Sequence, residues 1–283
     1  MLKAIIFDLD DTLLDWSLRT QDWLEYEQSY LTLVFGYLTG RVEVSGSVDD
    51  FVAAVRRLTQ EAWLESRKEL IAPNFLTILE KAFDSVGITL NRLDIDARLQ
   101  TLDWELIGGV APFADVVELL PVLESHHIKI GMITNAHFPM WMRDRELRSY
   151  GLLPYFADCR LASSDFGYLK PHPAIFRAAM DCLDVRPDEA VFVGDSPEAD
   201  MAGARAVGMR GVLRIGPHSA AKTNDAIAPD AIAPDGVINT LHELIPLLDS
   251  WYPGWRTINA SQHSDSPGNT GDSHGIATAR SLS

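Results

Sequence analysis

The stretch Lys3-Ala4-Ile5-Ile6-Phe7-Asp8-Leu9-Asp10-Asp11-Thr12 decides the fold expected for this chain of 283 residues. Its first half is a short β-branched and aromatic run, typical of a buried strand and too short for a buried helix. The run ends in three carboxylates within four positions, which oppose folding by mutual repulsion unless a cation compensates them. In an extended segment, Asp8 and Asp10 point to the same side. Such a pair at a strand end is typical of a divalent-metal site and of nucleophilic chemistry.

The charge balance limits the partners. Aspartate and glutamate number 40 against 24 lysines and arginines, which gives a formal net charge of −16. We therefore expect no nucleic-acid partner, because no basic patch would neutralise its phosphates. A small anionic substrate would need a metal ion and a few local cations.

The apolar content and the cysteines indicate the broad class of protein. The chain is 47% hydrophobic, which is enough for a large core. Cys159 and Cys182 are expected to be free thiols in a reducing compartment. No signal peptide and no run long enough to span a bilayer is visible. We expect no membrane partner and a cytoplasmic location.

The order of the apolar patterns predicts an inserted domain. Residues 15–107 carry helical periodicity and few strand signals, so we predict an all-helical cap there. Residues 1–14 and 108–250 would form the core, in which strands alternate with helices. That alternation favours an α/β fold with a doubly wound, Rossmann-like parallel sheet. Residues 256–283 are rich in Ser, Gly, Thr and Asn and are predicted to be a disordered tail.

The predicted elements place polar residues at one edge of the sheet. Strands are expected at 128–134, 159–163, 190–193 and 210–215, and helices at 75–86, 138–150, 173–183 and 198–207. Ligands of open parallel sheets bind at the carboxyl ends of the strands. Polar groups that fall at these ends or just beyond them would therefore share one pocket. They are Asp8 with Asp10, Thr134, Lys170, and Asp195 with Asp200.

Four motifs, in this order along the chain, resemble those of the haloacid dehalogenase-like superfamily. Any one motif is a weak signal, but four in order are highly specific. The resemblance covers about residues 1–250, and the predicted helical insert is similar to the type 1 cap of that superfamily. The motifs are Phe7-Asp8-Leu9-Asp10-Asp11-Thr12-Leu13, Ile133-Thr134-Asn135, Lys170-Pro171-His172-Pro173 and Gly194-Asp195-Ser196-Pro197-Glu198-Ala199-Asp200.

The resemblance implies a role for each matched residue. Asp8 would attack phosphorus and form an aspartyl-phosphate, and Asp10 would protonate the leaving oxygen and then activate water. Thr134 and Lys170 would hold the phosphate, while Asn135 would orient the loop or touch the phosphate. The implied cofactor is Mg²⁺. Its ligands would be Asp8, the backbone carbonyl of Asp10, Asp195 and Asp200, the last directly or through water.

Within the superfamily, the resemblance favours a hydrolase of phosphomonoesters. Haloacid dehalogenases lack the second acid, and phosphonoacetaldehyde hydrolases replace it, so Asp10 argues against both. Sugar phosphomutases keep both acids and stay an open alternative. A non-catalytic binding module is a weaker alternative, because the nucleophile, acid and metal-ligand positions are all filled.

Substrate selection is expected in the cap. The substrate would be a small phosphorylated metabolite, either a sugar phosphate or a nucleotide-like compound. Trp16 is the leading candidate for a substrate contact, because it lies just past the first motif. The cationic candidates are Arg19, Arg41, Arg56, Arg57, Arg67 and Lys68. The sequence gives no indication of whether the protein is a monomer or an oligomer.

Overall fold

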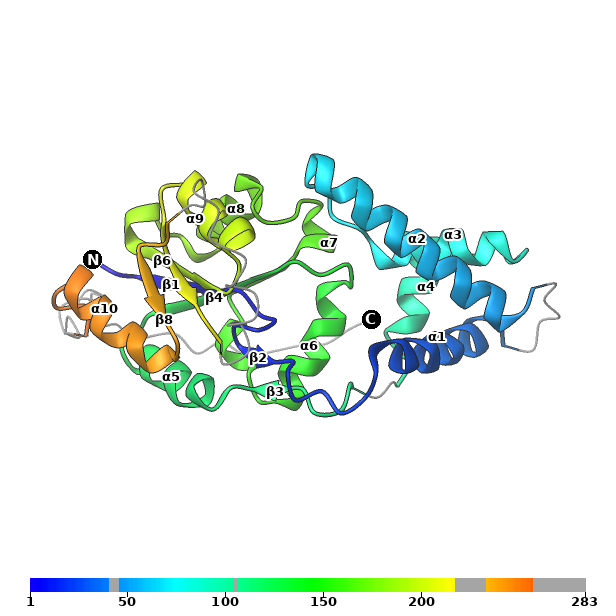
Figure 1. Cartoon of the computed structure of the whole chain (residues 1–283), viewed down its shortest axis with the longest axis horizontal. Helices are drawn as coiled ribbons and strands as arrows, with labels where there is room; N and C mark the ends of the chain where they lie inside the picture. Colours follow the sequence, from blue (N-terminus) through cyan, green and yellow to red (C-terminus); the bar gives the residue numbers. More distant parts are fainter. Residues whose placement is uncertain (41–45, 104–105, 217–232, 257–283) are drawn as a thin grey trace, which may run out of the picture.

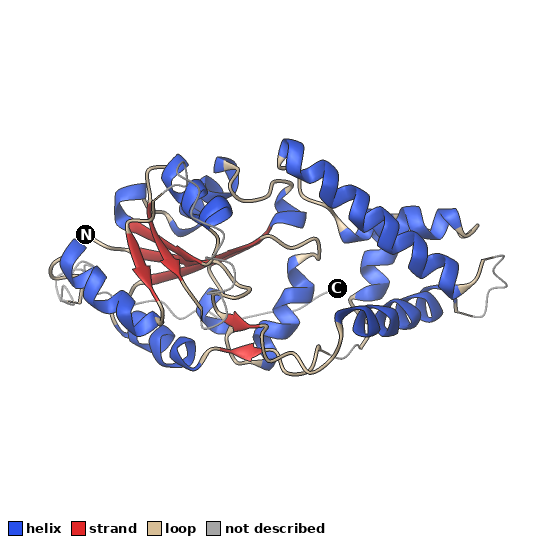
Figure 2. Cartoon of the chain, viewed as in Figure 1, coloured by secondary structure: helices blue, strands red, loops and turns tan. Residues whose placement is uncertain are grey.

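The computed structural model describes residues 1–40, 46–103, 106–216 and 233–256, and it shows a parallel sheet flanked by helices beside a group of further helices (Figures 1 and 2). The described part of the sheet has the strand order β5-β4-β1-β6-β7-β8. Each neighbouring pair of strands is parallel. The strands are β1 (Ala4–Phe7), β4 (Lys129–Thr134), β5 (Cys159–Ala162), β6 (Ala190–Gly194), β7 (Arg210–Arg214) and β8 (Gly236–Ile238). The predicted α/β fold is confirmed.

The alternating residues of β1 point into two separate hydrophobic clusters. Ile5 and Phe7 belong to the cluster on one face of the sheet, whereas Ala4 and Ile6 belong to the cluster on the other. A continuous apolar run is therefore required in this strand, because both faces are covered. The helices on the first face are α5 (Ala114–Ser125) and α10 (Leu244–Trp251), and those on the second are α8 (Pro173–Leu183) and α9 (Ala202–Ala206).

The helices α1 to α4, called the cap helices below, pack around a third hydrophobic cluster. Phe51 and Phe83 meet at its centre, with ring centroids 4.4 Å apart. Each cap helix begins at a residue whose side chain accepts a hydrogen bond from the first turn, which stabilises a helix start. The helices are α1 (Trp23–Thr39, capped by Asp22), α2 (Val48–Glu69, by Ser47), α3 (Phe75–Ser85, by Asn74) and α4 (Arg92–Leu99, by Asn91).

Two chain segments that connect the sheet to the cap helices lie side by side. Strands β2 (Leu14–Asp15) and β3 (Ala111–Pro112) form a short antiparallel ladder, and further along the backbone N–H of Thr20 donates to the carbonyl of Gly108 at 3.0 Å. Gly109 has a positive φ of 86°, and a Cβ atom there would lie 2.1 Å from the carbonyl oxygen of Leu18. Only glycine fits at that position.

A second contact joins the cap helices to the core. The backbone N–H of Ala72 donates to the carbonyl of Gly167 at 3.0 Å, and that of Leu169 donates to the carbonyl of Leu70 at 2.8 Å. The segment between α2 and α3 therefore pairs with the core loop that leads directly to Lys170.

Several predicted boundaries differ from the observed ones. Helix α6 (Met140–Ser149) begins two residues later than predicted, because Pro139 occupies its cap position. The predicted helix at 198–207 is a π-helical turn (Pro197–Met201) followed by α9. A short helix α7 (Ser163–Phe166) follows β5.

The predicted tail lies outside the described residues apart from Arg256. The division into core and cap domains stays a prediction.

Candidate active site

Most of the predicted site residues lie where three neighbouring strands of the sheet end. Asp8 directly follows β1, Thr134 ends β4, and Asp195 directly follows β6. Because β1 pairs in parallel with both β4 and β6, these three ends lie next to one another. Lys170 and Asp200 reach the same place from a loop and from the π-helical turn, as their ion pair shows.

Lys170 is the cation of this cluster. Its Nζ lies 2.5 Å from Oδ1 of Asp8 and 2.7 Å from Oδ1 of Asp200. Its side chain is only 2% exposed. Burial alone would lower the pKa of Lys170, but attraction by Asp200 and Asp8 outweighs burial and raises the pKa above its usual value. The ammonium therefore stays charged at any physiological pH.

The carboxylates outnumber this cation. Oxygens of Asp8, Asp195 and Asp200 lie within 4.8 Å of one another. Burial, followed by repulsion from Asp200 and Asp195, raises the pKa of Asp8 to about 8, although Lys170 opposes the shift. With a pKa of about 8, Asp8 is largely protonated at neutral pH unless further positive charge is present. When all three carboxylates are ionised, they and the one ammonium carry two net negative charges. A divalent cation would balance them, and carboxylate oxygens are the ligands that Mg²⁺ prefers, so the donor set fits this metal.

Local backbone geometry brings Asp200 into the cluster. A Cβ atom on Gly194 would lie 2.2 Å from Oδ2 of Asp200, so only glycine leaves room for the carboxylate. The backbone N–H of Ser196 donates to the same oxygen at 3.0 Å, and Asp200 itself is 1% exposed. The wide π-helical turn that contains Asp200 is of a kind often found at functional sites.

The second motif lies at the end of β4, and its residue Asn135 holds the backbone of Lys170 in place. The side-chain amide of Asn135 donates to the carbonyl of Lys170 at 3.0 Å, and its oxygen accepts from the backbone N–H of Lys170 at 2.8 Å. Asn135 thus holds the lysine loop through two hydrogen bonds, and its expected contact with phosphate stays a prediction. Thr134 is buried, with 1% of its surface exposed.

The carboxylate of Asp10 lies apart from this cluster and has its own donors. Nε1 of Trp16 donates to Oδ1 of Asp10 at 2.7 Å, and Nη2 of Arg143 donates to the same oxygen at 2.5 Å. Asp11, the next residue, has a positive φ of 61°, which lets the chain turn back within the first motif. Two donors on one oxygen fix the direction of the Asp10 carboxylate.

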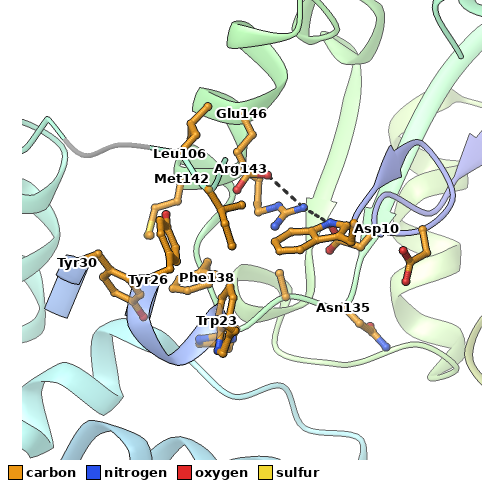
Figure 3. Close-up of a pocket in the computed structure, with 15 residues that line it drawn as sticks. Asp10, Trp23, Tyr26, Tyr30, Leu106, Asn135, Phe138, Met142, Arg143 and Glu146 are labelled. Atoms are coloured by element: carbon orange, nitrogen blue, oxygen red, sulfur yellow. Dashed lines mark hydrogen bonds and ion pairs between the residues drawn. The ribbon is translucent and has the colours of Figure 1, made fainter. Parts of the chain in front are cut away.

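A cavity of about 380 Å³ opens beside Asp10, as Figure 3 shows. Aromatic side chains form one of its walls in a continuous row. Ring centroids are 6.2 Å apart for Trp16 and Trp23, 5.8 Å for Trp23 and Tyr26, 5.6 Å for Tyr26 and Tyr30, and 6.2 Å for Tyr30 and Phe138. The row runs from the first motif along α1 to the loop that follows β4.

The cation of this cavity comes from the core and was missed by sequence reasoning. Arg143, on α6, pairs with Asp10 and also lies 3.3 Å from Glu146 one turn further along the helix. Burial raises the pKa of Glu146 to about 7, with Arg143 opposing and Asp10 adding to the shift. The only sequence signal was the spacing of three between Arg143 and Glu146, which is common on solvent-exposed helices.

The cationic candidates of the cap that the structure describes do not line this cavity. Arg56 pairs with Glu27 at 2.7 Å, and Arg57 pairs with Glu61 at 3.0 Å. None of the described cavity-lining residues is one of the six cap cations. Arg41 and the side chain of Arg67 lie outside what the structure describes.

Residues 2–208 match the haloacid dehalogenase-like hydrolase family. The chain belongs to this family. This hydrolase is 50% identical over 222 residues to a glyceraldehyde 3-phosphate phosphatase of Pyrococcus furiosus, across 75% of this chain and 80% of that protein. It is 29% identical over 224 residues to a ribulose-1,5-bisphosphate 5-phosphatase of Halopiger xanaduensis, across 75% and 84%. The resemblance inferred from the four motifs is confirmed.

Solved structures of the family share this architecture. A phosphatase of the family from Thermococcus onnurineus has a TM-score of 0.52 and 26% identity, across 87% of this chain and 98% of that one. A 2-haloacid dehalogenase from Pseudomonas syringae has a TM-score of 0.56 and 27% identity, across 89% and 100%. Because both reaction types occur among these similar structures, the side chains of the site must decide between them.

Proposed function

We propose that this hydrolase cleaves phosphomonoesters of small phosphorylated metabolites, with Mg²⁺ as cofactor and Asp8 as nucleophile. The observation that carries the proposal is the buried group of Asp8, Asp195 and Asp200 around Lys170. An ester dianion could approach this group only if cations compensate both the phosphate and the nucleophile. Lys170 is one such cation. Bound Mg²⁺, held by the three carboxylates and the backbone carbonyl of Asp10, would supply the rest of the positive charge.

In the first step, an oxygen of Asp8 attacks phosphorus and the bond from phosphorus to the leaving oxygen breaks. The leaving alkoxide takes a proton from Asp10, so an alcohol departs and an aspartyl-phosphate stays on the enzyme. Trp16 and Arg143 support this step by fixing the Asp10 carboxyl through hydrogen bonds to Oδ1. The hydroxyl of Thr134 would donate to the transferring phosphoryl group.

In the second step, water attacks the phosphorus of the aspartyl-phosphate. Asp10, now ionised, takes a proton from that water, and the bond between phosphorus and the Asp8 oxygen breaks. Inorganic phosphate and the original carboxylate are regenerated. Lys170 stays charged throughout and offsets the negative charge that returns to Asp8.

The hydrogen-bonded position of Asp10 favours this reaction over dehalogenation. A departing halide is a weak base and needs no proton, whereas an alkoxide is a strong base and must be protonated. An acid fixed by two donors beside a cavity is useful only in the second case. The names of the similar curated proteins, which are phosphatases, support the same choice.

The test is phosphate release from a panel of phosphomonoesters, with Mg²⁺ and with a chelator. We expect metal-dependent release by the parent protein and none by Asp8→Asn, which keeps the shape but removes the nucleophile. The matched control is Asp22→Asn, because asparagine also caps helices and Asp22 lies at the start of α1. Release of unchanged rate by Asp8→Asn would contradict the proposal, as would no release from any ester by the folded parent.

A labelled intermediate provides a second, independent readout. Acyl phosphates are cleaved by hydroxylamine, whereas phosphate esters of serine are not. We expect ³²P from substrate to be retained on the parent enzyme in a hydroxylamine-sensitive form. With labelled 4-nitrophenyl phosphate, whose leaving group hardly needs a proton, the label should accumulate in Asp10→Asn, because only water attack is then slowed. Label that resists hydroxylamine would contradict an aspartyl-phosphate.

A further inference from the structure

The cavity beside Asp10 lies where the alcohol part of a substrate would be held. Asp10 protonates the leaving oxygen in the reaction proposed above, and its side chain lines the cavity wall. The phosphate would be bound on the other side of Asp10, at the ends of the strands. The chemistry of the cavity wall therefore bears on which alcohol the enzyme accepts.

The charges that line the cavity disfavour a second anion. Among its described lining residues, Arg143 is the one permanently charged cation, and it already faces the carboxylates of Asp10 and Glu146. His137 also lines the cavity, but burial and then repulsion by Arg143 lower its pKa to about 4, so it is neutral. Because Arg143 is already shared between Asp10 and Glu146, a carboxylate or second phosphate on the alcohol would be buried without a cation of its own, which is costly.

The shape and the polar groups of the cavity favour a hydroxylated ring. The row of aromatic rings from Trp16 to Tyr30 offers apolar surface along one wall, with successive rings tilted by 44° to 59°. Aromatic surface of this kind packs well against the faces of ligand rings. Glu146 also lines the cavity and keeps 20% of its side chain exposed, and a carboxyl group accepts hydrogen bonds from hydroxyl groups. A volume of about 380 Å³ is much larger than a three-carbon alcohol needs.

We propose that this cavity selects esters whose alcohol is an uncharged, hydroxylated ring, and that it rejects esters whose alcohol carries a further anionic group. This inference rests on the phosphatase activity proposed above. It separates the chain from the similar protein named for ribulose 1,5-bisphosphate, whose substrate carries a second phosphate.

The test uses substrate pairs that differ in one group. Glucose 1-phosphate and glucuronate 1-phosphate share the ring and differ only by a carboxylate. We expect kcat/KM to be about tenfold or more higher for the uncharged member, because the site has no partner for the added charge. In uridine 5′-monophosphate the hydroxylated ring belongs to a nucleoside instead of a hexose. Comparison of its kcat/KM with that of glucose 1-phosphate therefore shows whether the cavity prefers a nucleoside or a hexose. Glycerol 3-phosphate is the uncharged ester without a ring.

Two variants assign the selection to the cavity. Glu146→Gln removes one of the two carboxylates that face Arg143, so we expect the preference for the uncharged sugar phosphate to narrow by about tenfold. Trp23→Leu removes one ring of the wall, so KM should rise by about tenfold for ring esters and stay unchanged for glycerol 3-phosphate. The matched controls are Glu124→Gln on α5 and Tyr37→Leu at the far end of α1, which do not line the cavity.

The outcomes distinguish this inference from the proposal on which it depends. Release confined to glycerol 3-phosphate, or faster release from glucuronate 1-phosphate than from glucose 1-phosphate, would overturn the inference and leave the phosphatase standing. A preference that neither Glu146→Gln nor Trp23→Leu changes would also overturn it. No release from any ester would overturn both.

Discussion

Trp16 and Arg143 share one hydrogen-bond acceptor, Oδ1 of Asp10, with donor distances of 2.7 Å and 2.5 Å. The first donor comes from the segment that leads into the cap helices, and the second comes from α6 of the core. The carboxyl group that we assign to proton transfer is therefore oriented from both sides of the cavity.

The phenylalanine substitution of Trp16 tests this orienting role. Trp16→Phe keeps a ring but loses the Nε1 donor, so Asp10 should protonate leaving groups less well. We expect kcat to fall by about tenfold for alkyl phosphates and to change little for 4-nitrophenyl phosphate, whose leaving group hardly needs a proton. Steady-state kinetics with both ester types measures the difference. Trp251→Phe, at the far end of the core, is the control, and an equal loss with both ester types would refute the orienting role.

Mg²⁺ is expected to stabilise the folded protein through the carboxylate cluster. A ligand at 100 times its Kd adds about 2.7 kcal/mol to the free energy of unfolding, so Tm should rise by a few degrees. Asp195→Asn removes one ligand and should abolish the rise, whereas Asp22→Asn should retain it. Thermal unfolding in MgCl₂, compared with NaCl at equal ionic strength, gives the result. A rise of the same size in Asp195→Asn would place the metal elsewhere.

A buried ion pair between Arg214 and Asp115 is expected to be important for stability. Nη2 of Arg214 lies 2.8 Å from Oδ2 of Asp115, and Nη1 donates to the carbonyl of Thr12 at 2.9 Å. Asp115→Asn would leave the buried guanidinium without its counter-charge and should lower the free energy of unfolding by about 3 kcal/mol. The exposed pair of Arg57 and Glu61 is the contrast, because Arg57→Gln should cost less than about 0.5 kcal/mol. Urea unfolding measures both, and equal costs would show that burial does not matter here.

His137 is expected to make the protein less stable in mild acid. Its pKa is lowered to about 4 by burial and by Arg143, whereas in the unfolded chain it is about 6.5. Between these values the unfolded chain binds a proton that the folded protein does not. The free energy of unfolding should therefore fall as the pH drops from 6.5 to 4, by roughly 1 to 3 kcal/mol from this residue.

Substitution of the histidine should remove this part of the pH dependence. In His137→Gln the free energy of unfolding should change less between pH 6.5 and 4 than in the parent. His127→Asn is the control, because His127 is exposed and asparagine tolerates its positive φ of 57°. Urea unfolding at a series of pH values gives the comparison, and parallel pH curves for His137→Gln and the parent would contradict the assignment.

The sequence predicted five of the six described strands of the sheet, because the central strands carry strong local signals, but it did not predict β8. The run before Asp8 is apolar at every position, as a strand covered on both faces must be, and each motif begins or ends at a turn. The ladder of β2 and β3 was not predicted, because each strand has two residues and no periodicity can be seen in so short a segment.

The candidate site was predictable only where it depends on the motifs. The shared position of Asp8, Thr134 and Asp195 follows from the predicted parallel sheet, since parallel strands end at one edge, whereas Lys170 comes from a loop and was assigned by its motif. The partner of Asp10 did not follow, because Arg143 is 133 positions away and its helix carries a mixed charge pattern. This contact arises because α6 packs against the loop that follows β1, and a local sequence pattern cannot predict such packing.

The backbone pairing of Leu70 and Ala72 with the loop before Lys170 limits which caps from other family members could replace the cap of this enzyme. A cap taken from another member of the family would have to supply a backbone segment with the same register at that place. Without one, the carbonyl of Gly167 and the N–H of Leu169 would lose their partners within the three residues that precede Lys170. The cap and the phosphate end of the site are therefore not interchangeable parts, and a successful graft would have to carry the segment between α2 and α3 together with the loop that it pairs with.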